Sequence, residues 1–362
     1  MHSNDLRQRL ADGIAAAGVY DALSAKLAER AGFSAVFISG YALEASLLGA
    51  PDLGLLTMTE VLEQTRRIVH ACGVPVICDI DTGFGGVNNV WRTVREMSRA
   101  GVAAVQLEDQ VNPKRCPYLG GRAAAPRGEA VARVATAVDA CADLETLVIA
   151  RTDADGISID EVIDRCNLYL AAGADAVIPL LMTADGYPMH NLNIDEQLAI
   201  HRRIVRSIEG PAVCVETPNG SRAQDMVDLG YALVETPLVG IQAAVNALDE
   251  AYRAVLDDAP APNRERLDPA GNLLDILDLP EYINRETRFN SAMARGCRAA
   301  PEPTHPRTEP HHGNHSHRAG ADGALRTPLR GNPTAGPRTR GSAHPSRGER
   351  IVCQRHRLVR RS

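Results

Sequence analysis

The sequence lacks the features that would place a protein in a membrane, in a disulfide framework or in a zinc ribbon. No segment approaches the roughly 20 apolar residues that a membrane helix needs, and the opening "MHSNDLRQRL" has no basic and then apolar signal pattern. The eight Cys are scattered singly, without a C-x-x-C pair, which argues against structural zinc and against disulfides. These absences predict a cytoplasmic protein that does not bind a membrane.

Positive charge is scarce outside the last part of the chain. The sequence holds 37 Arg but only two Lys, Lys26 and Lys114. Residues 1–296 carry a net charge of −15, whereas residues 297–362 carry +9. Because an acidic body is a poor partner for a polyanion, we expect no binding of nucleic acid.

The segment 297–362 differs in kind from the rest of the chain. It has no aromatic residue, but it holds 13 Arg, eight Pro and seven of the 11 His. This composition, without periodicity, predicts a disordered tail. One interpretation is a basic arm for anionic partners. The residue bias favours the other, an extension without function such as out-of-frame translation of a GC-rich gene.

Residues 1–296 alternate between short apolar runs and helix-like segments. The runs are nearly continuous rather than alternating, which is typical of parallel strands that are covered on both faces. A weak first run near residues 14–20 precedes seven clear ones, at 34–40, 74–81, 103–109, 146–153, 175–181, 211–216 and 232–238. Eight such units in about 250 residues predict an α/β fold of the (β/α)8 TIM-barrel type. A doubly wound sheet is the rival, which the lack of a Gly-rich dinucleotide fingerprint weakens.

Two helix starts are marked by capping boxes. Thr57 and Glu60 have the spacing of such a box, and so do Ser158 and Glu161. In each pair the hydroxyl and the carboxylate bind the two free N–H groups at the start of a helix. We therefore expect helices to begin directly after Thr57 and Ser158.

Acidic side chains follow two neighbouring strands at the end of the barrel where function collects. Asp79 and Asp81 are two residues apart, a spacing that puts both side chains on one face of a strand. Glu108 follows the next strand and can converge on them. Such hard oxygen ligands suit Mg²⁺. Acids that only cap helices or face solvent remain the alternative.

Arg151 directly follows another apolar run, in "IARTDA". The guanidinium can bind a carboxylate or phosphonate through two parallel hydrogen bonds. A salt bridge to a neighbouring acid at the barrel rim is the other interpretation, and the sequence favours neither.

Cys116 differs from the other cysteines because it lies in a polar loop after a strand. Lys114 and Arg115 precede it, and nearby cations lower the pKa of a thiol. Cys116 is therefore a candidate proton donor or base. Gly120 and Gly121 follow and would let this loop move as a lid.

Four motifs together resemble the isocitrate lyase / phosphoenolpyruvate mutase superfamily, in order over roughly residues 15–256. The motifs are "SGYALEASLLGAPDLG", "DIDTGFGG", "LEDQVNPKRC" and "ARTDA". The resemblance implies a homotetramer of (β/α)8 barrels, with a C-terminal helix swapped between neighbours. Three segments follow from it: a catalytic barrel at 1–260, a helical swap segment at 261–296 and the tail at 297–362.

The resemblance also implies a site and a chemistry. It implies Mg²⁺, with Mn²⁺ as an alternative, and a metal-stabilised enolate of a small carboxylate or phosphonate substrate. The implied metal ligands are Asp79, Asp81, Glu108 and Asp52. The implied substrate-binding residues are Ser39, Gly40, Tyr41 and Arg151, the first three through backbone N–H groups. Lys114, Arg115 and Cys116 match the gating loop of the lyases, with Cys116 as the acid or base.

Several positions depart from the superfamily pattern. Pro117 and Tyr118 stand where the lyases have Gly and His, and Leu180 or Leu181 stands near a usual Glu. Gln242 aligns with an Arg that grips an extra carboxylate in methylisocitrate lyases. The metal half of the site is therefore matched, whereas the substrate half is altered towards a different and smaller acid.

Three functions remain open at this point. The first is a Mg²⁺-dependent carbon–carbon lyase, or related hydrolase, that acts on a small 2-hydroxy or 2-oxo dicarboxylic acid. The second is a carboxyphosphonoenolpyruvate-type phosphonomutase that forms a P–C bond in natural-product biosynthesis. The third, an inactive barrel kept for its tetramer interface, is disfavoured by the complete set of acids, Lys-Arg-Cys and Arg.

Overall fold

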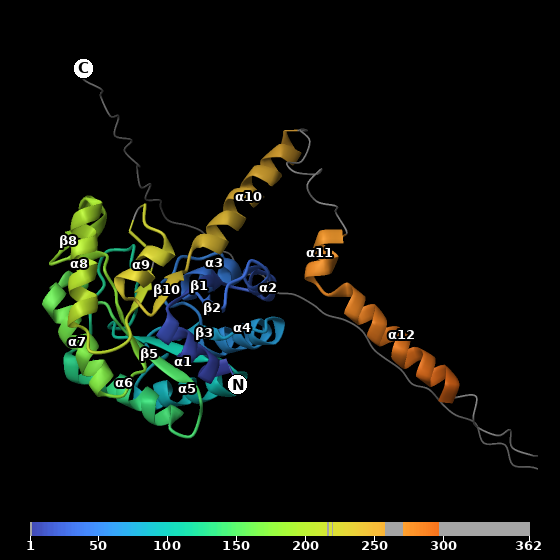
Figure 1. The fold of residues 1–362 in the computed structure, drawn as a ribbon, viewed down its shortest axis with the longest axis horizontal. Coiled ribbons are helices and arrows are strands. Elements are labelled where there is room, and N and C mark those ends of the chain that lie inside the picture. The colour runs from blue at the N-terminus through green and yellow to red at the C-terminus, as the bar shows by residue number, and fades with distance from the viewer. Residues whose placement is uncertain (1, 216, 219, 258–270, 297–362) are drawn as a thin grey trace, which may run out of the picture. The chain divides into compact units, whose positions relative to one another are not determined.

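The computed structural model describes residues 2–215, 217, 218, 220–257 and 271–296. The tail predicted at 297–362 lies outside these residues, as does the segment 258–270. Helices and strands alternate along most of the described chain (Figure 1). In the described residues no helix has the length and the apolar character needed to span a bilayer.

Eight parallel strands form a nearly closed barrel. They are β1 (Ile14–Val19), β2 (Ala35–Ile38), β3 (Val76–Asp79), β4 (Ala104–Glu108), β5 (Leu147–Thr152), β6 (Ala176–Pro179), β9 (Val213–Val215) and β10 (Leu233–Thr236). Their order in the sheet is β6-β5-β4-β3-β2-β1-β10-β9. A parallel bridge between Val177 and Ala212 joins the two ends of this order. The predicted (β/α)8 barrel is therefore confirmed, and the doubly wound alternative is wrong.

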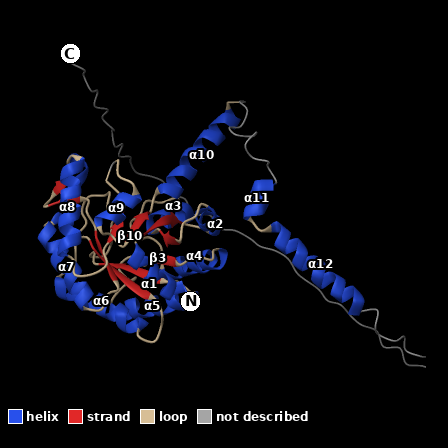
Figure 2. Cartoon of the chain, viewed as in Figure 1, coloured by secondary structure: helices blue, strands red, loops and turns tan. Residues whose placement is uncertain are grey.

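Helices surround the strands (Figure 2). The helices of the barrel region are α1 (His2–Asp12), α2 (Ala22–Arg30), α3 (Gly40–Leu48), α4 (Met58–Ala71), α5 (Val87–Ala100), α6 (Arg127–Cys141), α7 (Ile159–Ala171), α8 (Ile194–Ser207), α9 (Ala223–Leu229) and α10 (Val239–Leu256). Two short strands, β7 (Thr183–Ala184) and β8 (Tyr187–Pro188), pair as a hairpin after β6. Two more helices follow the barrel, α11 (Gly271–Ile276) and α12 (Leu279–Gly296).

Apolar side chains cover both faces of each strand, which explains the continuous apolar runs. Ile77 and Ile149 belong to one buried cluster, in which inward-facing residues of all eight barrel strands meet. Their neighbours Cys78 and Val148 belong to a second cluster that includes residues of α4, α5 and α6. Alternate residues therefore fill the barrel interior and the layer between the sheet and the helices.

One predicted capping box is complete and the other is half formed. Thr57 caps α4, and the Glu60 carboxylate returns to the Thr57 N–H at 2.8 Å. Ser158 caps α7 by accepting from the Glu161 N–H at 3.0 Å. The Glu161 carboxylate does not return to the cap, because it pairs with Arg165 at 2.7 Å and with a second arginine.

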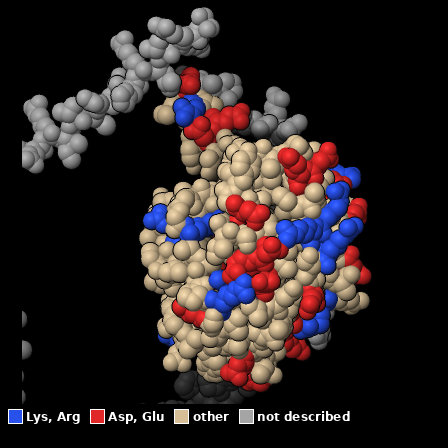
Figure 3. Space-filling model, turned by 90° about the vertical axis from the view of Figure 1, so that its left-hand side faces the viewer, with Lys and Arg blue, Asp and Glu red and all other residues tan. Residues whose placement is uncertain are grey.

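On the face drawn in Figure 3, charged side chains of both signs are scattered among other residues. Acidic and basic side chains lie next to one another there rather than in blocks of one sign. Ion pairs between neighbouring elements are part of this pattern, as between Arg203 of α8 and Asp160 of α7. Among the described residues, that face therefore presents no continuous basic stripe.

Candidate active site

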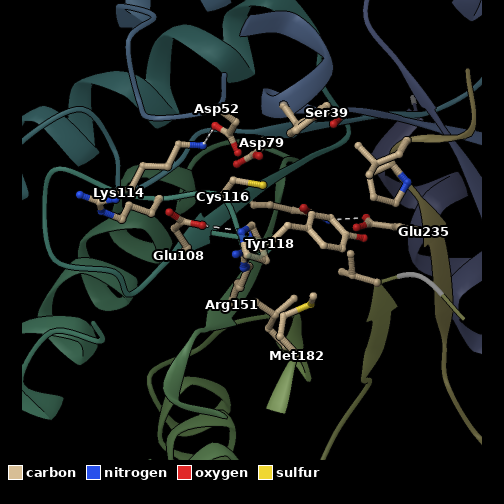
Figure 4. Close-up of a pocket in the computed structure, with 18 of the residues that line it drawn as sticks. Ser39, Asp52, Asp79, Glu108, Lys114, Cys116, Tyr118, Arg151, Met182 and Glu235 are labelled. Carbon is tan, nitrogen blue, oxygen red and sulfur yellow. Dashed lines mark hydrogen bonds and ion pairs between the residues drawn. The ribbon is translucent and has the colours of Figure 1, made fainter. Parts of the chain in front are cut away.

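A pocket opens where the carboxyl ends of the barrel strands meet (Figure 4). Its walls come from the ends of β2, β3, β4, β5, β9 and β10, from the segment after β6 and from the loop after β4. The predicted site residues that line it are Ser39, Tyr41, Asp52, Asp79, Glu108, Lys114, Arg115, Cys116 and Arg151. Nine of the eleven predicted residues are therefore brought together, and the other two, Gly40 and Asp81, adjoin them.

Asp79 and Asp81 converge, but not for the reason that the sequence suggested. Asp79 is the last residue of β3, and Asp81 lies beyond the strand with a left-handed backbone, φ 49°. The Asp81 N–H donates to Asp79 Oδ1 at 2.9 Å. A Cβ on Gly40 would lie 2.9 Å from Asp79 Oδ2 and 3.4 Å from Asp81 Oδ1. A tight turn, rather than strand alternation, thus brings both carboxylates to one place.

The ammonium group of Lys114 lies among these acids. Its Nζ pairs with Asp52 and lies 2.7 Å from Asp81 Oδ1. The side chain is buried. Burial lowers the pKa of Lys114, but Asp81 and Glu108 outweigh it and hold the pKa well above its ordinary value. Lys114 therefore stays protonated and contributes a positive charge among the carboxylates.

Arg151 is the second buried cation of the pocket. Its guanidinium contacts Glu108 Oε2 at 3.2 Å and Asp153 Oδ1 at 2.7 Å. Arg122 approaches the same Asp153 oxygen at 2.7 Å. The salt bridge at the rim that the sequence allowed is thus present. The same guanidinium lines the pocket, so it is also placed to meet a bound anion.

Negative charge exceeds positive charge within this group. Four carboxylates, those of Asp52, Asp79, Asp81 and Glu108, face the two cations Lys114 and Arg151. Burial and Asp81 raise the pKa of Asp79 to about 6, and burial raises that of Glu108 well above its ordinary value. Among the described residues, Glu108 Oε1 is buried without a hydrogen-bond partner.

This donor set suits a divalent cation. Buried charges need compensation, and a doubly charged ion would offset most of the negative charge of these carboxylates. Oxygen ligands of this kind are those that Mg²⁺ prefers. In the described part of the chain, no three acidic, His or Cys side chains are grouped so that they could hold an ion as they stand. Lys114 already lies between Asp52 and Asp81, so it would have to withdraw.

Cys116 lies in the same pocket and is buried. Its N–H donates to the Asp52 carbonyl at 3.1 Å, which ties the loop after β4 to the segment after α3. The lowered pKa that the neighbouring cations predict is wrong, because burial raises the pKa of Cys116 more than Lys114 and Arg151 lower it. Cys116 is therefore a thiol that can donate a proton, and it is a poor base in this environment.

Comparison with known proteins identifies this arrangement. The profile of the family described as phosphoenolpyruvate phosphomutase matches residues 6–256. The chain belongs to this family. The predicted resemblance to the isocitrate lyase / phosphoenolpyruvate mutase superfamily is thus confirmed, and the chain is an enzyme of that superfamily.

Relatives of the phosphomutase family with named activities include both lyases and mutases. The chain is 37% identical to 2,3-dimethylmalate lyase of Eubacterium barkeri, over 78% of this chain and 94% of that protein. It is 36% identical to 2-methylisocitrate lyase of Aeropyrum pernix, over 76% and 86%. It is 34% identical to the chloroplastic carboxyvinyl-carboxyphosphonate phosphorylmutase of Arabidopsis thaliana, over 76% and 80%.

Solved structures of the same superfamily share the fold. Oxaloacetate acetylhydrolase in complex with 3,3-difluorooxalacetate superposes with a TM-score of 0.71 at 26% identity, over 80% of this chain and 97% of that one. Phosphonopyruvate hydrolase in complex with oxalate and Mg²⁺ superposes with a TM-score of 0.68 at 30% identity, over 80% and 99%. Carbon–carbon cleavage by a lyase or hydrolase is the main activity among these relatives.

Three of the residues that depart from the superfamily pattern lie in the pocket, whereas Gln242 lines a neighbouring hollow with Tyr41 and Cys116. The three that line the pocket are Pro117, Tyr118 and Leu180. In the view of Figure 4, Tyr118 lies between Cys116 and Glu235. The cavity volume is about 60 Å³, whereas one water needs roughly 10–15 Å³ on the same measure. The pocket as it stands therefore admits only a small molecule.

Sequence reasoning missed two polar residues of the pocket, Gln106 of β4 and Glu235 of β10. Both are buried, and Gln106 Nε2 donates to Glu235 Oε1. The signal was present, because Glu235 interrupts the apolar run "ALVETPL" close to its end. An acid at a strand end is the same signal that found Asp79 and Glu108.

Proposed function

We propose that the chain is a Mg²⁺-dependent carbon–carbon lyase, or related hydrolase, for a small 2-hydroxy or 2-oxo dicarboxylic acid. The observation that carries the proposal is a buried thiol, Cys116, in one pocket with a surplus of carboxylates and a buried Arg151. The lyases and the hydrolase among the relatives support the reaction class.

The carboxylates of Asp52, Asp79, Asp81 and Glu108 would hold the ion, Mg²⁺ or alternatively Mn²⁺. When bound, it would supply Lewis-acid stabilisation of negative charge that develops on a substrate oxygen. Lys114 neutralises part of the same carboxylate group in the described arrangement, and it would move aside with the loop after β4. The ion would thus replace the single charge of Lys114 by a double charge, so the negative charge of the group would be smaller by one unit.

Two elements are placed to bind a substrate carboxylate. Ser39 is the N-cap of α3 and lines the pocket together with Tyr41. The free N–H groups at the start of that helix would bind the carboxylate. Arg151 offers a guanidinium from β5. Together they would orient the acid so that its reacting carbon approaches Cys116.

Proton transfer would complete the reaction. When the carbon–carbon bond of a 2-hydroxy acid breaks, its hydroxyl group loses a proton and becomes the carbonyl group of the released 2-oxo acid. The electron pair of the broken bond stays on the other carbon as a carbanion, and that carbon must receive a proton. Cys116 carries a proton because burial raises its pKa. The thiol would donate it to the carbon, and solvent would restore it when the loop after β4 opens.

A phosphonomutase is the second candidate function. Lys114, Arg115 and Cys116 match the loop of the carboxyphosphonoenolpyruvate mutases as well as that of the lyases, and one relative carries that type of name. In this case the same pocket would rearrange a small phosphonate and form a P–C bond.

An activity panel tests both candidates. Purified protein with Mg²⁺ is mixed with dimethylmalate, methylisocitrate and oxaloacetate, and the released 2-oxo acid or oxalate is followed. We expect turnover of at least one acid, and Cys116→Ser should lower kcat by about 10²–10⁴-fold. Cys72→Ser, outside the pocket, is the control. No release from any of the three acids, together with a new P–C signal in phosphorus NMR, would favour the mutase.

We also propose a cytoplasmic homotetramer. None of the six cysteines that the structure describes forms a disulfide bond, which fits a reducing compartment. Apolar side chains stand exposed along α10 and α12, among them Tyr252 and Phe289. Contact with other copies of the chain would cover them. We also propose that the catalytic barrel ends at residue 260 and that the helical swap segment ends at residue 296.

A further inference from the structure

The wall of the pocket formed by β6, β9 and β10 is apolar, with one exception. Leu180, Val215 and Leu238 line this side, together with Phe37 of β2. Glu235 of β10 lies among them, and in the view of Figure 4 it stands across the pocket from Lys114. A carboxyl group has thus been placed on the side opposite the carboxylates that would hold the ion.

The two oxygens of Glu235 have different surroundings. Oε1 accepts a hydrogen bond from Gln106 Nε2. Oε2 is buried, and among the described residues it has no hydrogen-bond partner. Buried polar groups are almost always paired, so an unpaired oxygen that lines a pocket indicates a partner that enters the pocket.

Glu235 is set up to be a neutral acid. Glu235 is fully buried, and the group that donates a hydrogen bond to its carboxyl group is the uncharged amide of Gln106. An isolated carboxylate in such surroundings takes up a proton instead of remaining charged. Burial raises the pKa of Glu235 to about 8, against the opposing effect of Gln106. Two charged groups also act on Glu235. The negative charge of Asp79 raises its pKa further, and the positive charge of Arg151 lowers it.

The position of the proton follows from the hydrogen bond. Because Oε1 accepts from Gln106, Oε1 is the carbonyl oxygen and Oε2 carries the hydrogen. The O–H group then lies on the oxygen without a partner in the protein. It needs an acceptor, and the apolar neighbours on this wall supply none.

We propose that Glu235 determines substrate specificity: its Oε2–H donates a hydrogen bond to an acceptor oxygen at the end of the substrate farther from the carboxylate group. This deepens the proposed function, and rests on it, because the near end of the acid must already be held by the ion and Arg151. The acceptor is a second carboxylate, or a carbonyl oxygen, of a four-carbon acid.

The selectivity of such a subsite follows from the cost of an unpaired group. An acid without the distal acceptor leaves the Glu235 O–H buried and unsatisfied, and sites of this kind reject such analogues strongly. We expect a two-carbon diacid that is held by the ion and Arg151 to be too short to reach this wall. Its affinity should depend on the ion and Arg151 alone.

Binding of two diacids tests the proposal. Calorimetry with Mg²⁺ measures the affinity of oxalate, a two-carbon probe, and of 3,3-difluorooxaloacetate, a four-carbon probe. Glu235→Leu removes the donor, and we expect it to weaken the four-carbon probe at least tenfold while oxalate binding stays within threefold. Glu235→Gln keeps an N–H donor in the same place, and we expect both affinities within about threefold of the wild type. Glu63→Leu, which removes an exposed carboxylate on α4, is the control.

Each outcome decides the matter. Equal binding of the four-carbon probe to the wild type and to Glu235→Leu overturns the proposal. An equal loss in Glu235→Gln and Glu235→Leu also overturns it, because Glu235 would then act as a carboxylate. If Glu235→Leu does not fold, the wild type is measured with 2-oxobutyrate, which lacks the distal carboxylate. Binding as tight as that of 3,3-difluorooxaloacetate overturns the proposal, and binding at least tenfold weaker supports it.

The proposed function fails in a different way. If oxalate does not bind with Mg²⁺ while the four-carbon probe still depends on Glu235, the ion-binding function falls and the specificity subsite stands. If neither probe binds to the wild type, both the proposed function and the proposed role of Glu235 are overturned.

Discussion

At the scale of single residues, the pocket combines groups whose charges the sequence reveals with groups whose burial it does not. Asp79, Glu108 and Lys114 were found because charged residues at strand ends stand out in an acidic chain with two lysines. The direction of the Cys116 pKa was predicted wrongly. Neighbouring cations are visible in a sequence, whereas the burial that outweighs them depends on the folded loop.

Gly40 provides a test of the carboxylate group. A Cβ at this position would meet Asp79 Oδ2 at 2.9 Å, closer than real Cβ contacts allow, so Asp79 must shift. We expect Gly40→Ala to weaken Mg²⁺-dependent binding of oxalate at least tenfold, measured by calorimetry. Gly156→Ala is the matched control, because a Cβ at Gly156 has no neighbour within 4 Å. Equal oxalate binding in Gly40→Ala and the wild type would remove Asp79 from the ion site.

At the scale of elements, the sequence predicted all eight strands, but its apolar runs extend past the ends of the strands. Continuous apolar runs are a strong signal, since each strand contributes to a buried layer on both faces. The run at 74–81 extends past the end of β3 because Asp81 turns into a left-handed conformation. The contribution of Glu235 was missed for a related reason. Which side chains of a strand face the pocket depends on the barrel register, and a short apolar run does not fix it.

The apolar stripe on α10 provides a test of assembly. Val245, Leu248, Tyr252 and Val255 are 49–65% exposed and lie along one side of the helix. We expect Tyr252→Lys to convert the homotetramer into smaller species in sedimentation velocity, because a charge cannot be buried there without a partner. Glu250→Lys, on the opposite side of α10, should sediment like the wild type. A wild-type monomer at micromolar concentration would contradict the proposed assembly.

At the scale of the whole molecule, the stability of the fold should depend on pH through a buried histidine. His201 of α8 is 6% exposed, and its Nδ1 lies 2.8 Å from the Tyr231 hydroxyl. Burial lowers the pKa of His201 to about 4, below the value of roughly 6.5 in an unfolded chain. Between these values the unfolded chain binds more protons, so the stabilising contribution of neutral His201 is present above pH 6.5 and is lost towards pH 4.

Chemical denaturation across this range measures the effect. The free energy of unfolding should fall by on the order of 3 kcal/mol through His201 as the pH drops from about 6.5 to about 4. His201→Gln should remove this part of the slope, since glutamine does not titrate. His70→Gln, an exposed position on α4, should leave the slope unchanged. Parallel pH profiles of the wild type and His201→Gln would refute the assignment.

The scarcity of lysine gives the loop after β4 a chemical label. Lys26 is partly accessible, with 27% of its side chain exposed, and Lys114 is enclosed by carboxylates with 6% exposed. Amine-selective reagents such as acylating esters therefore meet few targets on this protein. Acylation of Lys114 requires its ammonium to leave Asp52 and Asp81, lose its proton and reach the reagent. The rate at which that one amine is modified thus reports how often the pocket opens, without any engineered probe.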